Sequence, residues 1–78
     1  MNEGTIREKV IAAFNKACTK YPSNNIELVV NDMTGMLDLM YTSKHNSFLI
    51  ESDIVKVTAD NADSLIDIFD DLNLAYSV

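Results

Sequence analysis

Between residues 26 and 58, apolar side chains recur at every second position, and this alternation limits the folds open to the chain. A period of two is typical of β-strands that bury one face and expose the other. Two polar stretches, residues 31–35 and 43–47, interrupt the pattern, and we expect a turn at each, the first with a glycine at positive φ. The region therefore predicts three strands, or four if residues 48–58 form two short strands rather than one bent strand.

The alternation assigns the strand residues to two faces. The face expected to point inward is apolar throughout: Ile26, Leu28, Val30, Leu37, Leu39, Tyr41, Phe48, Ile50, Val55 and Val57. The outer face combines five apolar side chains with four charged ones: Val29, Met36, Met40, Leu49 and Ile54 beside Glu27, Asp38, Glu51 and Lys56. An exposed apolar patch of this kind typically marks an interaction site, and methionine is common at binding surfaces. Either a partner or a second copy covers this face, or a helix crosses to it, or the strand register differs.

Helical spacing replaces the alternation on both sides of this region. An apolar stripe with a period of 3.6 predicts a first helix over residues 5–21. Thr5 and Glu8 stand at the spacing of a capping box, and Pro22 stops the helix.

A second apolar stripe predicts a helix over residues 61–73, capped by Asp60 or Asn61. The predicted fold is α+β, with the order α-β-β-β(-β)-α. An antiparallel meander sheet with two helices packed on one face hides these stripes most economically. We expect residues 1–78 to form a single domain.

The charge of the chain is concentrated in its last third. Twelve acidic and six basic residues give a net charge of −6; residues 1–50 carry five of each, and residues 51–78 carry seven acids and one base. Such a surface repels phosphates and anionic lipids and attracts basic proteins. We therefore expect no direct nucleic-acid binding, no membrane binding, and a basic protein surface as the partner.

Four aspartates gather on one side of the second predicted helix. Asp63, Asp67, Asp70 and Asp71 fall within roughly 100° of one another on a helical wheel. Like charges four residues apart each cost about 0.2–0.5 kcal/mol, and no Lys or Arg on this helix offsets them. A partner-binding acidic face and a merely solvated face are both consistent with this pattern.

No combination of residues predicts catalysis. Cys18 is the only cysteine, so no internal disulfide forms, and a Cys18–His45 pair lacks a third group to orient it. Residues 60–63 lack the glycine and distal glutamate of a calcium loop. We expect no enzyme activity, no cofactor and no metal, and a cytoplasmic location, since neither a signal peptide nor an apolar membrane span is evident.

These observations lead to two functional hypotheses. The first is a small acidic interaction module that inhibits or modulates a basic, nucleic-acid-handling partner. Small acidic inhibitors encoded by phages and mobile elements share this composition, which is an analogy and not a family relationship. The alternative is a homodimeric structural or assembly subunit that associates through the outer sheet face.

Overall fold

The computed structural model describes the backbone of residues 3–76 and the side chains of residues 4–72. The elements in chain order are α1 (Glu3–Cys18), the short 3-10 helix η1 (Ser23–Asn25), β1 (Ile26–Asn31), β2 (Met36–Thr42), β3 (Ser47–Glu51) and α2 (Ala62–Tyr76). The three strands form one antiparallel sheet in the order β1-β2-β3. The predicted α+β class is therefore confirmed, whereas the fourth strand does not form and η1 was not anticipated.

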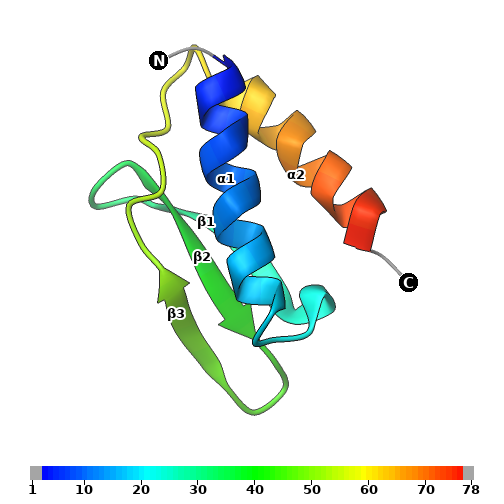
Figure 1. Ribbon diagram of the computed structural model, residues 1–78. Coiled ribbons are helices and arrows are strands. Elements are labelled where there is room, and N and C mark those ends of the chain that lie inside the picture. The colour runs from blue at the N-terminus through cyan, green and yellow to red at the C-terminus, as the bar shows by residue number, and fades with distance from the viewer. Residues whose placement is uncertain (1–2, 77–78) are drawn as a thin grey trace.

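The two helices lie side by side, and α1 crosses in front of β1 and β2 (Figure 1). α2 lies on the side of α1 away from β3 (Figure 1). The buried core draws on both helices and on the sheet region: Ile6, Val10, Ala13, Phe14, Ala17, Ile26, Leu37, Leu39, Val55, Leu65, Ile68 and Leu72. Its largest fully buried side chains include Phe14 from α1, Leu39 from β2 and Ile68 from α2, so both helices and the sheet contribute to one core.

Helix α1 differs from its prediction at both ends. It begins at Glu3, so Thr5 lies inside the first turn and is not the N-cap. It ends at Cys18, where the N–H groups of Lys20 and Tyr21 both donate to the Ala17 carbonyl at 3.0 Å. Pro22, which has no N–H to continue such a ladder, then directs the chain into η1.

The turn between β1 and β2 follows its predicted chemistry. Gly35 has φ +72°, a region that suits glycine, and its N–H donates to the Asn31 carbonyl at 2.7 Å. The Asn31 side chain also accepts the Met33 N–H at 2.9 Å. The strands on either side pair in register from Ile26↔Tyr41 to Asn31↔Met36.

A bulge in β3 changes the face assignment at its end. Met40 pairs with Leu49 and Leu39 with Glu51, which leaves Ile50 as the extra residue. Because paired residues share a face, Glu51 lies on the inner side with Leu39, and its predicted place on the outer face is wrong.

Residues 54–57 rejoin β2 beyond this bulge without forming a strand. The Ile54 N–H donates to the Leu37 carbonyl at 2.9 Å, and the Leu37 N–H donates to the Val55 carbonyl at 2.8 Å. Met36 and Lys56 form a bridge, and the Val57 N–H then donates to the Gly35 carbonyl at 2.8 Å. The segment from 48 to 58 is therefore one strand followed by a bridge, with an excursion at residues 52–53 between them.

The buried carboxylate of Asp38 holds this excursion in place. Asp38 is only 7% exposed, although the alternation predicted a charged residue on a wet face. Its Oδ1 atom accepts the N–H of Asp53 at 3.0 Å, at the point where Asp53 takes φ +56°. The excursion returns over β2 and covers Asp38, which explains the burial.

Asn61 joins residues 56–58 to the start of α2. Its carbonyl accepts the Leu65 N–H at 3.0 Å, which places Asn61, rather than Asp60, at the predicted cap position. Its side chain does not cap the helix but accepts the Thr58 N–H and donates to the Lys56 carbonyl, both at 2.8 Å. This side chain therefore fixes where α2 leaves the sheet.

We predict that Asp38→Ala lowers the free energy of unfolding by about 1–3 kcal/mol, because it leaves the Asp53 N–H without its acceptor. Asp38→Asn keeps an acceptor oxygen and should lose less than Asp38→Ala. Urea denaturation followed by circular dichroism measures both. Equal losses for the two variants would show that the hydrogen bond to Asp53 does not hold the excursion.

Candidate interaction surfaces

The predicted acidic face lies on helix α2 and is open to solvent. Asp63, Asp67, Asp70 and Asp71 are all exposed, and Leu65, Ile68 and Leu72 are buried on the opposite side of the helix. We call these four aspartates the α2 acidic face. All four lie within α2 (Ala62–Tyr76), so the helical spacing that groups them applies.

One member of this face forms an ion pair that the sequence did not reveal. Arg7 Nη2 on α1 donates to Asp71 Oδ2 at 2.8 Å, with the side chains 43% and 56% exposed. A pair this exposed contributes at most about 1 kcal/mol. In the part of the chain with described side chains it is the one salt bridge, so Asp63, Asp67 and Asp70 have no basic partner there.

The longer helix changes the electrostatic cost of this face. Helix α2 ends at Tyr76 rather than at residue 73, so Asp70 and Asp71 precede the last turn. The helix dipole acts mainly within that turn, and the predicted penalty for carboxylates near the C-terminal end is therefore reduced. Repulsion between Asp63 and Asp67, four residues apart, remains at about 0.2–0.5 kcal/mol.

The outer sheet face carries its predicted apolar side chains to different degrees. Leu49 is 50% exposed and Val29 is 38% exposed, whereas Met36 and Met40 are half-buried. Ile54, also half-buried, packs against the core cluster. Between the flanking Val29 and Leu49 lies the buried Asp38, so this face is less open than the alternation indicated.

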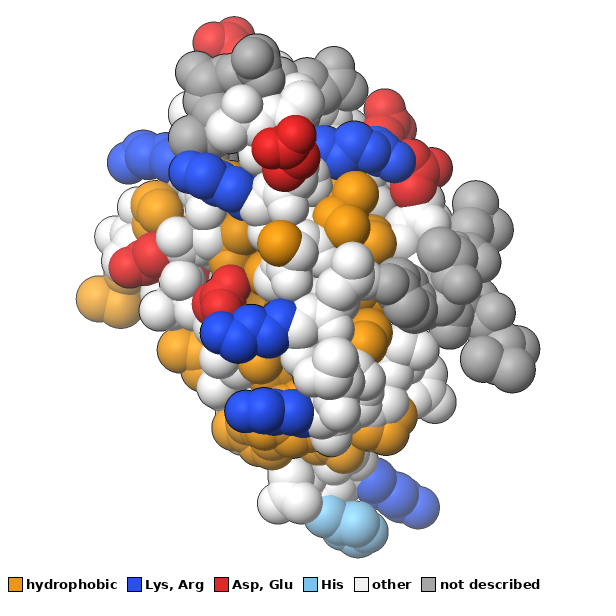
Figure 2. Space-filling model, in the orientation of Figure 1, with side chains coloured by type: hydrophobic (Ala, Val, Ile, Leu, Met, Phe, Trp, Pro, Cys, Tyr) orange, Lys and Arg blue, Asp and Glu red, His pale blue; other side chains and the backbone are white. Residues whose placement is uncertain are grey.

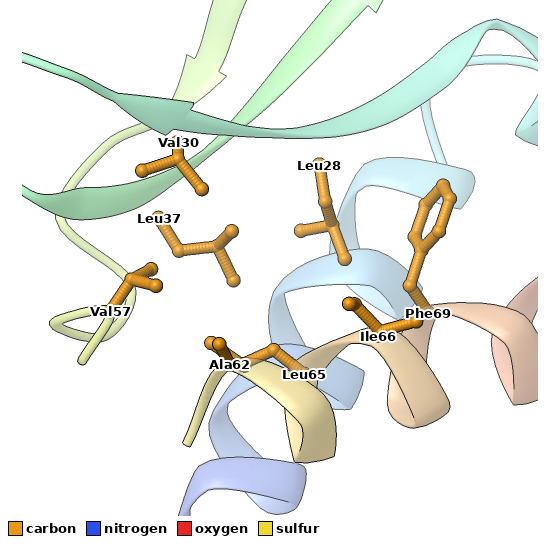
Figure 3. A pocket seen from close by; sticks show the side chains of 8 residues that line it. All are labelled: Leu28, Val30, Leu37, Val57, Ala62, Leu65, Ile66 and Phe69. Carbon is orange, nitrogen blue, oxygen red and sulfur yellow. The ribbon is translucent and has the colours of Figure 1, made fainter. Parts of the chain in front are cut away.

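An apolar hollow separates α2 from the sheet, which sequence analysis did not anticipate. Its volume is about 260 Å³, and eight side chains line it: Leu28, Val30, Leu37, Val57, Ala62, Leu65, Ile66 and Phe69. Leu28 projects from β1 toward Phe69 on α2 across the open space (Figure 3). Val30, predicted to be buried, is 45% exposed because α2 does not close over it, and Ile66 is 58% exposed. We call this space the β1–α2 hollow.

A second, more polar hollow of about 240 Å³ lies between α1 and β3. Lys16 of α1 and Lys20, which follows the helix, line it together with Glu51 of β3. Basic side chains are spread over the α1 face of the molecule (Figure 2). The hollow beside β3 is therefore mixed in charge, in contrast to the apolar one beside β1.

Three aromatic rings close the end of the core near this second hollow. Tyr41 and Phe48 stack with ring centroids 4.8 Å apart, and Tyr21 meets them at 5.3 and 5.4 Å. Phe48 was predicted to be inside but is 40% exposed, because β3 is an edge strand and only one side of the ring is covered. The Tyr41 hydroxyl accepts the Asn25 side-chain amide at 3.1 Å.

The residues considered for catalysis or metal binding lie apart from one another. Cys18, at the end of α1, packs against the core, and burial raises the pKa of its thiol, which opposes thiolate formation. His45 is exposed in the turn between β2 and β3. Within the described residues, no three His, Cys, Asp or Glu side chains converge as metal ligands.

No protein-family model, curated protein or solved structure matches this chain. Among the described helices, none has the length and apolar character needed to cross a bilayer.

We predict that Ala62→Leu leaves the free energy of unfolding unchanged or raises it by up to about 2 kcal/mol, because the added carbons enter the β1–α2 hollow. Val10→Phe is the matched control: Val10 is fully buried and lines neither hollow, so the larger ring should cost about 1–3 kcal/mol. Thermal and urea unfolding compare the two. A loss of similar size in both variants would contradict the hollow.

Proposed function

We propose that this protein is a non-enzymatic interaction module whose α2 acidic face docks on a basic surface of a partner protein and thereby blocks or modulates that partner. The observation that carries the proposal is the state of Asp63, Asp67 and Asp70. They are exposed in a row on one helix, and no basic side chain among residues 4–72 forms a salt bridge with them. These carboxylates repel one another, and a basic surface that covers them replaces this repulsion with attraction.

The rest of the molecule favours a protein partner over a nucleic acid. The net charge of −6 opposes contact with phosphates, whose neutralisation supplies most of the affinity for nucleic acids. The same charge attracts proteins that themselves grip phosphates through lysine and arginine. A carboxylate row on a helix can occupy such a basic groove, and we propose a nucleic-acid-handling protein as the target.

We predict that the triple variant Asp63→Asn/Asp67→Asn/Asp70→Asn binds immobilised basic nucleic-acid-binding proteins of the host about tenfold more weakly than the native chain. Each substitution keeps an acceptor oxygen but removes the charge that strengthens its contact with lysine or arginine, and three such losses correspond to a change of about this size. Surface plasmon resonance at several salt concentrations measures it, and affinity should fall as salt rises.

A control variant separates the α2 acidic face from bulk charge. Glu8→Gln/Asp32→Asn/Asp53→Asn also removes three charges, from exposed positions on α1, in the first turn and in the excursion after β3. Its affinity should stay within about threefold of the native value, because dissolved salt screens charges that lie far from the contact. Equal weakening by both triple variants would reduce the effect to net charge and overturn the proposal.

The exposure of Val29 and Leu49 on the outer sheet face favours a second function, a homodimeric subunit. On the same face, Met40 pairs with Leu49, and Met36 lies two positions along β2 from Asp38, the partner of Val29; both methionines would adapt to a symmetric partner. This interface uses the sheet face opposite the β1–α2 hollow and leaves the α2 acidic face free.

We predict that, if this dimer forms, Met40→Asp shifts it to monomer in sedimentation velocity, because the substitution places a charge within the apolar patch. Met33→Asp serves as the control, since Met33 is 96% exposed in the first turn. A native chain that sediments as a monomer at millimolar concentration would exclude the dimer.

A further inference from the structure

We propose that the free edge of β1 and the β1–α2 hollow together bind an extended segment of the partner, in which apolar residues alternate with lysine or arginine. This inference rests on the proposed function and specifies how the basic partner is held. Three features lead to it: the direction of the β1 backbone groups, the shape and chemistry of the hollow, and the charges around it.

The hydrogen bonds of β2 determine which way its neighbours face. Leu37 exchanges hydrogen bonds with Ile54 and Val55, at 2.9 and 2.8 Å, so its backbone groups point away from β1. Successive residues of a strand direct their backbone groups to opposite edges. Asp38 therefore points its backbone groups at β1, toward its partner Val29.

The same alternation applies within β1. Since Val29 faces β2, its neighbours Leu28 and Val30 direct their N–H and C=O groups to the outer edge. In the described part of the chain, β2 is the one strand that pairs with β1. An open edge of this kind accepts a further strand, and paired backbone groups supply affinity without regard to sequence.

Side chains of an added strand would meet the hollow. Leu28 and Val30 line it from β1, and residues paired with them have side chains on the same face. Ile66 and Phe69 line the opposite wall on α2 (Figure 3). A volume of about 260 Å³ lies below the roughly 300–1,000 Å³ of a typical small-molecule site and suits a few aliphatic side chains.

Carboxylates stand on both sides of the β1 edge, so their combined field favours a basic segment. Ile66, on the rim of the hollow, has Asp63 three residues before it and Asp70 four residues after it, so both are its neighbours on the helix surface. On the other face of the edge, Glu27 is exposed and stands beside the alternate side chains of an added strand. Neither β1 nor α2 contains a lysine or arginine.

The same charges disfavour a second copy as the occupant. Two β1 strands paired edge to edge would bring together chains of net charge −6, each with Glu27 on the joining strand. Like charges across a contact are destabilising. Pairing of two copies through β1 is therefore an outcome that the test must detect rather than the expected one.

The probe is a fluorescein-labelled peptide of nine residues in which lysine and valine alternate, starting and ending with lysine. When the peptide pairs antiparallel to β1 with its valines opposite Leu28 and Val30, the valines face the hollow and their N–H groups point at β1. Fluorescence anisotropy measures affinity for the full chain, and NMR-detected amide exchange locates the contact. The amides of Leu28 and Val30 should gain protection on binding.

Two methylated peptides form the matched pair. N-methylation of the two central valines removes the donors that face β1 and should weaken binding about tenfold, since each missing donor costs a hydrogen bond. N-methylation of the second and fourth of the five lysines removes the same number of donors from the outer edge and should change affinity by about twofold or less. Ala62→Leu, which fills the hollow, should weaken binding about tenfold.

Several results would overturn this inference. They are no binding at millimolar peptide, equal effects of the two methylated peptides, or protection along β3 instead of β1. Protection of Leu28 and Val30 in the free protein, with a dimer in sedimentation velocity, would make a second copy the occupant.

The triple variant of α2 separates this inference from the proposed function. If Asp63→Asn/Asp67→Asn/Asp70→Asn abolishes binding but valine methylation does not, the acidic face acts alone and the β1 edge is not used. If valine methylation abolishes binding but the triple variant binds normally, the edge is used and the proposed function fails.

Discussion

Strand β2 forms hydrogen bonds with neighbouring segments along both of its edges. β1 pairs with one edge over six residues, whereas β3 and residues 54–57 divide the other edge between them. The point where they divide is irregular, and there the side chain of Asp38 accepts the N–H of Asp53. A buried carboxylate on β2 thus helps to keep the central strand paired along its length, while Leu37 and Leu39 on its inner side belong to the buried core with the helices.

The hollow is present because the chain has too few helices to cover the whole inner face of the sheet. A chain of 78 residues can build only a small core, and here α1 supplies most of the cover for the sheet. Helix α2 buries Leu65, Ile68 and Leu72, but its apolar surface continues around the helix to Ile66, which is 58% exposed. The apolar arc of α2 is therefore wider than the contact it makes, and apolar surface left over at a hollow is typical of a site for another molecule.

Sequence patterns correctly predicted the features that depend on residues close together in the chain. The alternation located three strands, and the first turn, because strand faces and a glycine at positive φ follow from neighbouring residues. The exposure of Asp38 and the face of Glu51 were predicted wrongly, because an excursion and a bulge depend on pairing between distant segments. The acidic face was predictable from helical spacing. The Arg7–Asp71 pair joins residues 64 positions apart and required the relative placement of the two helices, and the β1–α2 hollow required the placement of α2 relative to the sheet.

The two candidate contacts lie on different sides of the molecule and do not compete. The β1–α2 hollow is lined by inner-face residues such as Leu28 and Leu37, whereas Val29 and Met40 lie on the outer face. A dimer formed through the outer face would present two α2 acidic faces and two free β1 edges. Because linked sites raise the effective concentration of the second contact, such a dimer would bind a partner with two basic segments more tightly than either chain alone. Association through the outer face would therefore strengthen the proposed inhibitory contact rather than replace it.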